Sequence, residues 1–445
     1  MARRPARSCG PACGLAWWLS LSVVCALADC ARGVAHTPEV PSSPARGAAP
    51  DAEAAERRAE PPSGDVQRAA TRDAIVRGAA LAVRFECTRC HAHAELARPP
   101  DDANCAGCHA QVARGTLDVG ADEATQALWR AHVRSYLNVP SLTYLGARLR
   151  RSAIAEMVQA PHDVRPHLAE TMPRLAVSAA EAADLAAWLA PEAEAPARAL
   201  PHDAATLAHG RQLVEELGCG TCHERCGEHI PARPLRVAID AESLTRGIAL
   251  APDLAEVPTR LRRDRLVQWL LAPRTIDPET TMPALPRSRA EAEAIAAYLS
   301  YAPIVPRAQP AAPVRLPLLG RRVTFAEVEE RVFRRSCWHC HSEPDFNEGD
   351  GGPGNTGGFG FAGRGLSLAS ASAVRSGARD DAGLRRSILR SAPGETARLV
   401  EVLLARQREE AGDVRALRGM PLGLPALSAE DIQLVESWIA GGAGE

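Results

Sequence analysis

A five-residue pattern, Cys-x-x-Cys-His, constrains this chain more than any other feature of its sequence. It occurs four times and uses eight of the 13 cysteines, in the copies Cys87-Cys90-His91, Cys105-Cys108-His109, Cys219-Cys222-His223 and Cys337-Cys340-His341. Cysteines three residues apart lie on one face of a helical turn, and the histidine follows directly. The pattern therefore predicts four short turns that each present two thiols and one imidazole to a common partner.

The partner that fits this arrangement is haem c. Two such thiols can add to the two vinyl groups of a haem, and the histidine then binds the iron. Zinc knuckles pair two Cys-x-x-Cys units, but Cys219 and Cys337 have no second unit nearby, and zinc does not explain the histidine. We expect four covalently bound haem c groups, with all eight motif cysteines as attachment points and four axial histidines, His91, His109, His223 and His341.

Three of the five methionines stand directly before a proline, downstream of a motif, at Met172, Met282 and Met420. Each is followed by an apolar helical pattern with an aromatic residue near its end, at Trp188, Tyr298 and Trp438. A thioether opposite histidine raises the potential of a haem iron, and the proline stiffens the loop that presents it. We expect these three methionines to be iron ligands, whereas Met157 fits a helical core pattern.

The three stretches that contain these pairs resemble class I cytochrome c domains. In that family a helix ends at Cys-x-x-Cys-His, and the chain later reaches Met-Pro and a C-terminal helix that crosses the first. The resemblance covers residues 75–440 apart from linkers. It implies a mainly α fold of three tandem cytochrome c-like helical domains joined by Pro-rich linkers, with domains at residues 71–190, 204–302 and 320–441.

An internal repeat relates the first two units and isolates the second motif. Gly78 and Gly210 each precede a motif cysteine by nine residues, and the segment Arg148–Arg151 matches Arg260–Arg263. The helical spacing around the repeated arginines favours a solvated helix face, with haem propionates as alternative partners. The first unit has 20 extra residues, which contain the Cys105 motif, so its haem site is an insertion into domain 1.

The Cys105 haem has no methionine of its own, because Met172 belongs to the repeat and thus to the Cys87 haem. We expect His132, on a helical pattern within the insertion, to be its sixth ligand, which makes a bis-histidine haem of lower potential. His93, His162 and His167 are the alternatives, and an open five-coordinate iron is another. The remaining histidines are expected at the surface or in loops, at His36, His202, His209, His229 and His339.

The N-terminus is typical of an export signal. Three arginines precede an uncharged, mainly apolar stretch at residues 15–28, which ends in a small-x-small cleavage pattern. Residues 1–30 are therefore a signal peptide or a lipoprotein signal, because Cys30 follows in an imperfect lipidation box. Residues 31–70, rich in Pro, Ala and Ser, are expected to be a disordered tether. A periplasmic or exported product follows, either free or anchored by a lipid.

Two further segments need an explanation. A glycine-rich run at residues 349–365 follows the fourth motif, and we expect it to fold over the haem edge, since calcium-loop spacing is not met. Cys226 lies three residues after His223 and has no haem role by spacing, which leaves a free thiol or a disulfide with Cys30.

Composition narrows the function further. All 52 basic residues are arginines, and 54 acidic residues balance them, so no global field favours nucleic acid. Only 17 residues are aromatic, which is few for three cores unless the haems fill them. We expect a periplasmic electron carrier or subunit of the respiratory chain, with redox proteins or a membrane complex as partners and membrane contact only through lipidated Cys30. The alternative is a haem enzyme, a peroxidase or reductase, with an open Cys105 iron.

Overall fold

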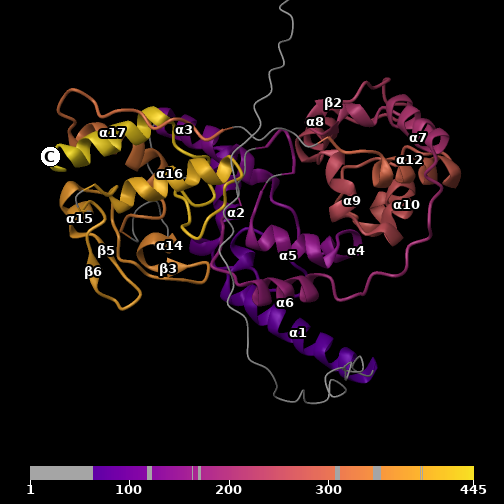
Figure 1. The fold of residues 1–445 in the computed structure, drawn as a ribbon, viewed down its shortest axis with the longest axis horizontal. Coiled ribbons are helices and arrows are strands. Elements are labelled where there is room, and N and C mark those ends of the chain that lie inside the picture. The colour runs from indigo at the N-terminus through magenta and orange to yellow at the C-terminus, as the bar shows by residue number, and fades with distance from the viewer. Residues whose placement is uncertain are drawn as a thin grey trace, which may run out of the picture. The chain divides into compact units, whose positions relative to one another are not determined.

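The structure is a computed structural model of the chain. It describes residues 64–117, 123–162, 164–168, 172–305, 311–343, 352–390, 392 and 394–445. The expected signal at residues 1–30, with Cys30, and the tether as far as residue 63 lie outside these ranges. The described part is mainly helical, as predicted, and its strands form three two-residue antiparallel pairs (Figure 1). Within it, no helix combines the length and the hydropathy needed to cross a bilayer.

The first group of elements contains the first two motifs. Its helix α1 begins at Gly64, so the last residues of the segment expected as a tether are helical. The α-helices are α1 (Gly64–Arg84), α2 (Cys105–Arg114), α3 (Glu123–Val133), α4 (Leu145–Arg148), α5 (Arg151–Gln159) and α6 (Ala179–Leu189). Short 3-10 turns join them at η1 (Cys87–Arg89), η2 (Asp101–Ala103) and η3 (Arg134–Asn138).

The second group contains the third motif. Its helices and turns are α7 (Ala204–Glu216), η4 (Cys219–Thr221), α8 (Ala241–Leu250), η5 (Leu254–Glu256), α9 (Val257–Arg260), α10 (Arg263–Leu271), α11 (Pro273–Ile276) and α12 (Arg289–Tyr301). A tight hairpin pairs β1 (Glu224–Arg225) with β2 (Glu228–His229). Asp203 is the N-cap of α7, and Ser288 is the N-cap of α12. Each side chain accepts a hydrogen bond from a backbone amide of the first turn, which stabilises the start of the helix.

The third group contains the fourth motif. Its helices are α13 (Phe325–Val328), the π-helix η6 (Glu329–Cys337), α14 (Gly352–Asn355), α15 (Ala371–Ser376), α16 (Arg398–Glu410) and α17 (Ala429–Ala440). Two small hairpins pair β3 (Gly357–Gly358) with β4 (Phe361–Ala362) and β5 (Ala378–Arg379) with β6 (Arg385–Arg386). This group departs most from the other two, because a π-helix precedes its motif and two hairpins follow it.

An early helix crosses a late helix in each of the first two groups, α1 against α6 and α7 against α12. Glycine permits the close approach. A Cβ on Gly78 would lie 2.1 Å from the carbonyl oxygen of Asp184, and one on Gly210 would lie 2.2 Å from that of Ala294. The aromatic residues expected near the ends of the late helices lie at the same contacts, at Trp188 and Tyr298. The repeat seen in the sequence is thus a repeat of one helix crossing.

The third group builds its crossing from bulky side chains instead. Val328, nine residues before Cys337, is fully buried, and so is Trp438 of α17. The ring of Trp438 lies 5.7 Å from that of Phe325 and 6.1 Å from that of Phe333, measured between centroids. Aromatic packing here replaces the glycine contact of the other two groups.

The repeated arginine segments pair with each other, and the expectation that they form a solvated helix face is wrong. Leu149 and Leu261 form an antiparallel bridge. The amide of Arg150 donates to the carbonyl of Arg260 at 2.9 Å, and the amide of Arg262 donates to that of Arg148 at 2.8 Å. These are equivalent positions of the repeat, so the first two groups meet through the same segment with local two-fold symmetry.

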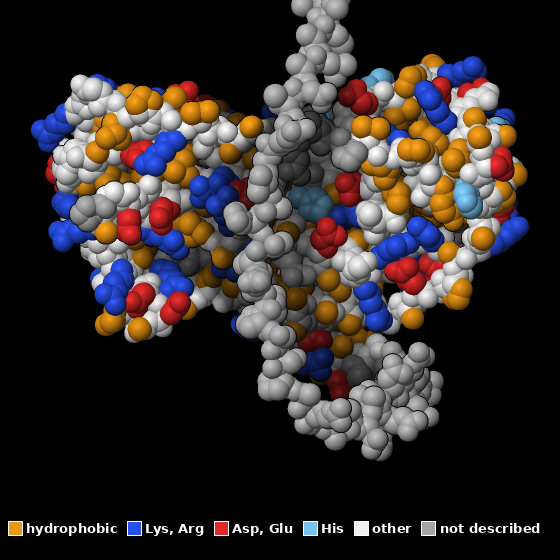
Figure 2. All heavy atoms as spheres, in the orientation of Figure 1, with side chains coloured by type: hydrophobic (Ala, Val, Ile, Leu, Met, Phe, Trp, Pro, Cys, Tyr) orange, Lys and Arg blue, Asp and Glu red, His pale blue; other side chains and the backbone are white. Residues whose placement is uncertain are grey.

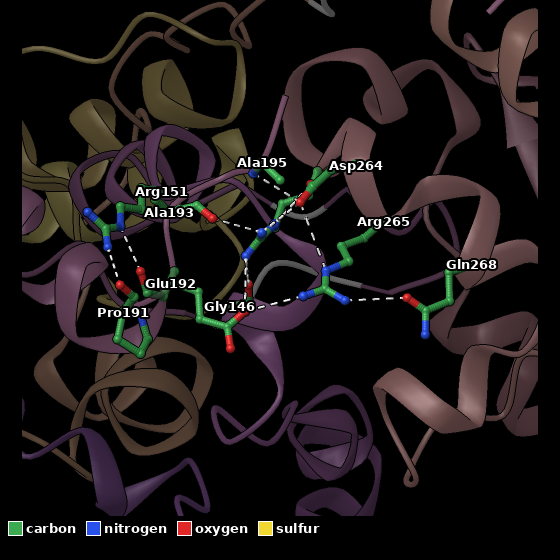
Figure 3. A network of polar contacts seen from close by, with 11 residues as sticks. Gly146, Arg151, Pro191, Glu192, Ala193, Ala195, Asp264, Arg265 and Gln268 are labelled. Carbon is green, nitrogen blue, oxygen red and sulfur yellow. Dashed lines mark hydrogen bonds and ion pairs between the residues drawn. The ribbon is translucent and has the colours of Figure 1, made fainter. Parts of the chain in front are cut away.

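Arg262 is the most buried member of this contact, with a side chain only 2% exposed. Its guanidinium donates to the carbonyl oxygens of Gly146 and Ala193 and to the carboxylate of Asp264 (Figure 3). The three acceptors come from three segments, and Asp264 also accepts from the amide of Ala195 at 3.2 Å. All three nitrogens of this guanidinium donate hydrogen bonds, and they join the linker after α6 to the second group.

Candidate haem sites

The four motifs are each one helical turn. In three of them the amide of the histidine donates to the carbonyl of the first cysteine, at 2.9 Å for His91, 3.0 Å for His223 and 2.9 Å for His341. The remaining motif opens α2, where the side chain of Asn104 accepts from the amide of Gly107 at 2.9 Å. A helical turn places the two thiols and the imidazole of each motif on adjoining positions of one face.

Two of the motif histidines have the same partner in equivalent places. The Nδ1 atom of His91 lies 2.8 Å from the carbonyl oxygen of Pro140, and that of His223 lies 2.8 Å from that of Pro252. A carbonyl oxygen only accepts, so Nδ1 carries the proton and Nε2 keeps its lone pair. Burial lowers the pKa of both imidazoles, which keeps them neutral. A neutral ring with its tautomer set by a carbonyl is the form that binds a metal through Nε2.

Asp253, which directly follows Pro252, holds the loop around His223. Its two carboxylate oxygens accept from the amides of Cys226 at 2.9 Å, Gly227 at 2.6 Å and Ala255 at 2.7 Å. Cys226 has a positive φ of 58°, so these bonds hold the turn of the β1–β2 hairpin against the proline loop. The carboxylate thus fixes the carbonyl that orients His223. Cys226 is a turn residue that forms no disulfide with another cysteine of the described ranges, and Cys30, its alternative partner, lies outside them.

Each Met-Pro methionine packs into the same hydrophobic core as the first cysteine of a motif. Met172 shares a core with Cys87, Met282 shares one with Cys219, and Met420 shares one with Cys337. These are the pairings proposed from the sequence intervals. A thiol for attachment and a thioether thus border each of three separate cores, although 63 to 85 residues separate them along the chain.

The histidine of the fourth motif is tightly enclosed by the chain. The Nδ1 atom of His341 is buried and has no hydrogen-bond partner within the described part of the chain. A Cβ on Gly354 would lie 2.1 Å from that atom, so only glycine fits over the ring. A Cβ on Gly352 would lie 2.7 Å from the Cα of Cys340. The described end of the glycine-rich run therefore lies directly on the motif, and burial lowers the pKa of His341 to about 4.

The second motif lies among residues of the first and the fourth. Cys105 and Cys90 are close enough for a thiol–thiol hydrogen bond, which together with burial raises the pKa of Cys90. The ring of His109 lies 4.8 Å from that of Tyr136 and 6.3 Å from that of His339, between centroids. The hydroxyl of Tyr136 in turn donates to the carbonyl of Gly423. Three of the four motifs are thereby brought to one region.

The donor set of each motif suits haem better than a free metal ion. No group of three or more His, Cys, Asp or Glu side chains in the described ranges could hold an ion. Haem c needs only two thiols and one or two axial ligands, since the porphyrin supplies the other four. Burial raises the pKa of Cys87 and Cys219 to about 11 and that of Cys337 to about 12, so these cysteines are protonated thiols. The residues present therefore fit the group that the motifs imply.

The other histidines named for the Cys105 iron have contacts of their own. The ring of His93 lies 4.4 Å from that of Trp188, with the planes tilted by 40°. The Nδ1 atom of His162 lies 3.0 Å from the carbonyl of Ala160. His167 faces Glu224 at 4.0 Å. His132 is in α3, but its side chain lies outside what the structure describes.

No protein-family model, no curated protein and no solved structure matches the chain. The sites therefore rest on their own geometry.

Sequence reasoning missed two parts of this geometry. Asp253 gave no signal except its place after the repeated proline. Phe359 and Phe361, from the glycine-rich run, pack into the core of the first group, and the amide of Phe359 donates to Glu86 at 2.9 Å. Glu86 directly precedes the first motif, so the third group covers part of the first site. An aromatic pair inside a glycine-rich run was the only available signal.

Proposed function

We propose that the chain is a multihaem c-type cytochrome that transfers electrons in the periplasm, as a respiratory-chain carrier or subunit. The observation that carries the proposal is the shared environment of His91 and His223. In both, a proline carbonyl accepts the Nδ1 proton at 2.8 Å and leaves Nε2 available for iron. The same arrangement in two distant motifs indicates a common ligand that selects it.

The division into three cytochrome c-like domains is part of this proposal. Three separate hydrophobic cores support it, because each contains a motif cysteine and a Met-Pro methionine. Proline-rich segments at residues 191–203 and 302–320 separate the stretches that supply most of these cores, and Phe359 and Phe361 of the third group add to the first core. Class I cytochrome c domains are the family that this arrangement resembles.

Haem supplies reversible one-electron chemistry when bound, at a potential set by its axial ligands. The residues of this chain would attach it through thioether bonds, orient the imidazole and place a methionine on the opposite side. Met172, Met282 and Met420 would each occupy the position that a substrate would need. Three sites closed in this way favour electron transfer over turnover.

Export and partners follow from the same proposal. Haem c is attached outside the cytoplasm, and the N-terminal pattern of the sequence fits such export. The partners are redox proteins, or a membrane respiratory complex near which the tether holds the domains. A lipid on Cys30 would be the route to membrane contact.

Haem counting tests the function directly. The full-length protein, expressed with export and haem maturation, is assayed as the pyridine haemochrome and by intact mass. We expect four haems per chain, and three after Cys219→Ser is combined with Cys222→Ser. Cys226→Ser is the matched control and keeps four, since its thiol belongs to the hairpin turn. A double variant with an unchanged haem count would refute the assignment of the motifs.

A further inference from the structure

Two histidines from distant parts of the chain face each other near the second motif. His109 is the last residue of that motif and lies in α2, whereas His339 lies inside the fourth motif, between Cys337 and Cys340. Their ring centroids are 6.3 Å apart, and the ring planes make an angle of 45°. The sequence predicts His339 among the surface and loop histidines, because nothing in its spacing connects it to Cys105.

We propose that His339 is the sixth ligand of the haem attached through Cys105 and Cys108, opposite His109. This rests on the proposed function, because it requires a haem at the second motif. A metal–imidazole bond is about 2 Å long, so two rings that bind one iron from opposite sides have centroids about 6 Å apart. Both ring planes contain the bond axis, which leaves the angle between them free. The observed separation of 6.3 Å matches this distance, and the angle of 45° between the rings is one that such a pair can adopt.

Two other ring side chains near the first two motifs have contacts of their own. The ring of His93 lies 4.4 Å from that of Trp188, tilted by 40°, and its Nδ1 accepts from the amide of Glu95 at 3.2 Å. Tyr136 is adjacent to His109, but its hydroxyl donates to the carbonyl of Gly423.

The two rings meet in an interface with several independent contacts. Arg174 forms an ion pair with Glu409 at 2.9 Å, and the side chain of Glu409 is only 7% exposed. Arg418 lies over the ring of Phe361, which itself packs into the core of the first group. These contacts join the first group to the third. The approach of His109 to His339 is therefore one part of an extended packing.

The bond between His339 and the iron would also set the direction of electron transfer between the Cys105 and Cys337 sites. A bis-imidazole iron has a lower potential than one with imidazole and thioether ligands. Met420 belongs to the core of the fourth motif, whose own imidazole is His341, two residues from His339. Electrons that reach the Cys105 site would then move downhill to the Cys337 site through a shared segment of chain.

The test replaces His339 in the full-length, haem-loaded protein. His339→Ala should keep four haems by pyridine haemochrome but convert one of the four from low-spin to high-spin in optical and electron paramagnetic resonance spectra. Added imidazole should reverse the change by filling the emptied position. His209→Ala, at an exposed position of α7, is the control and should leave all haems low-spin, whereas His132→Ala tests the ligand expected from the sequence.

Three results would overturn the proposal. These are a wild-type protein with one high-spin haem, a His339→Ala variant with four low-spin haems, or a His132→Ala variant that alone gains the high-spin signal. The last would make His132 the ligand. His339→Met supplies a second measurement, because it should stay low-spin and raise the potential of one haem in a redox titration. A wild-type count other than four would instead count against the function itself.

Discussion

The crossing of α7 and α12 permits a quantitative test through Gly210→Ala. The new Cβ would lie 2.2 Å from the carbonyl oxygen of Ala294 and 2.7 Å from the Cβ of Tyr298. Ordinary contacts between such atoms begin at about 3.5 Å, so the two helices must move apart by about 1 Å. Both obstacles belong to the partner helix and not to the mobile end of a side chain, so neither can simply rotate away.

The expected cost follows from two opposing effects. Overpacking a closed contact costs about 3 kcal/mol, at the upper end of the usual range. Alanine recovers about 1 kcal/mol over glycine inside a helix. The net destabilisation is about 2 kcal/mol. Because the amides at the crossing exchange their hydrogens only when the helices open, their exchange should become about 30-fold faster.

Hydrogen exchange followed by mass spectrometry of the full chain measures this locally. We expect peptides from α7 and α12 to lose protection in Gly210→Ala, while peptides from α16 and α17 keep theirs. His209→Ala is the control, because it introduces the same residue one position earlier on an exposed part of the helix. Equal or slower exchange in Gly210→Ala would refute the argument that glycine is required at this crossing.

Three further predictions concern single side chains. Asp253→Ala removes the acceptor of three amides and should destabilise the second group by about 3 kcal/mol in urea unfolding, and equal midpoints would contradict the role of this carboxylate. Arg262→Ala leaves Asp264 buried without its main partner and should cost about 3 to 5 kcal/mol in the same assay. The exposed neighbour Arg265→Ala should cost under about 1 kcal/mol, so similar losses in both variants would show that burial does not matter here. Met282→Ala should lower the potential of one haem by on the order of 0.1 V in a redox titration, whereas Met157→Ala, without an adjacent proline, should leave all potentials unchanged.

The contact between the first and third groups changes how the proposed haem sites relate to one another. Considered along the chain, the first and fourth motifs are 250 residues apart, from Cys87 to Cys337. The contacts of Tyr136 with Gly423 and of Phe359 with Glu86 bring residues beside these motifs together. The insertion that contains Cys105 thus lies between two sites and not at the edge of one.

The sequence by itself determined the features that depend on short-range spacing. The four motifs can be identified because their cysteines and histidine have the spacing of a helical turn. Local patterns of the same kind predict the Met-Pro pairs, the repeat and the mainly α class. The glycines before Cys87 and Cys219 were visible as a repeat, but their role in the two helix crossings was not.

Tertiary structure alone decided which distant residues meet. The pairing of Leu149 with Leu261, the burial of Arg262 and the approach of His339 to His109 all join segments more than 100 residues apart. No periodicity encodes such contacts, because they depend on how preformed helices pack their remaining faces. An arginine or histidine that the sequence predicts to be exposed can therefore lie at a contact between distant segments once the chain is folded.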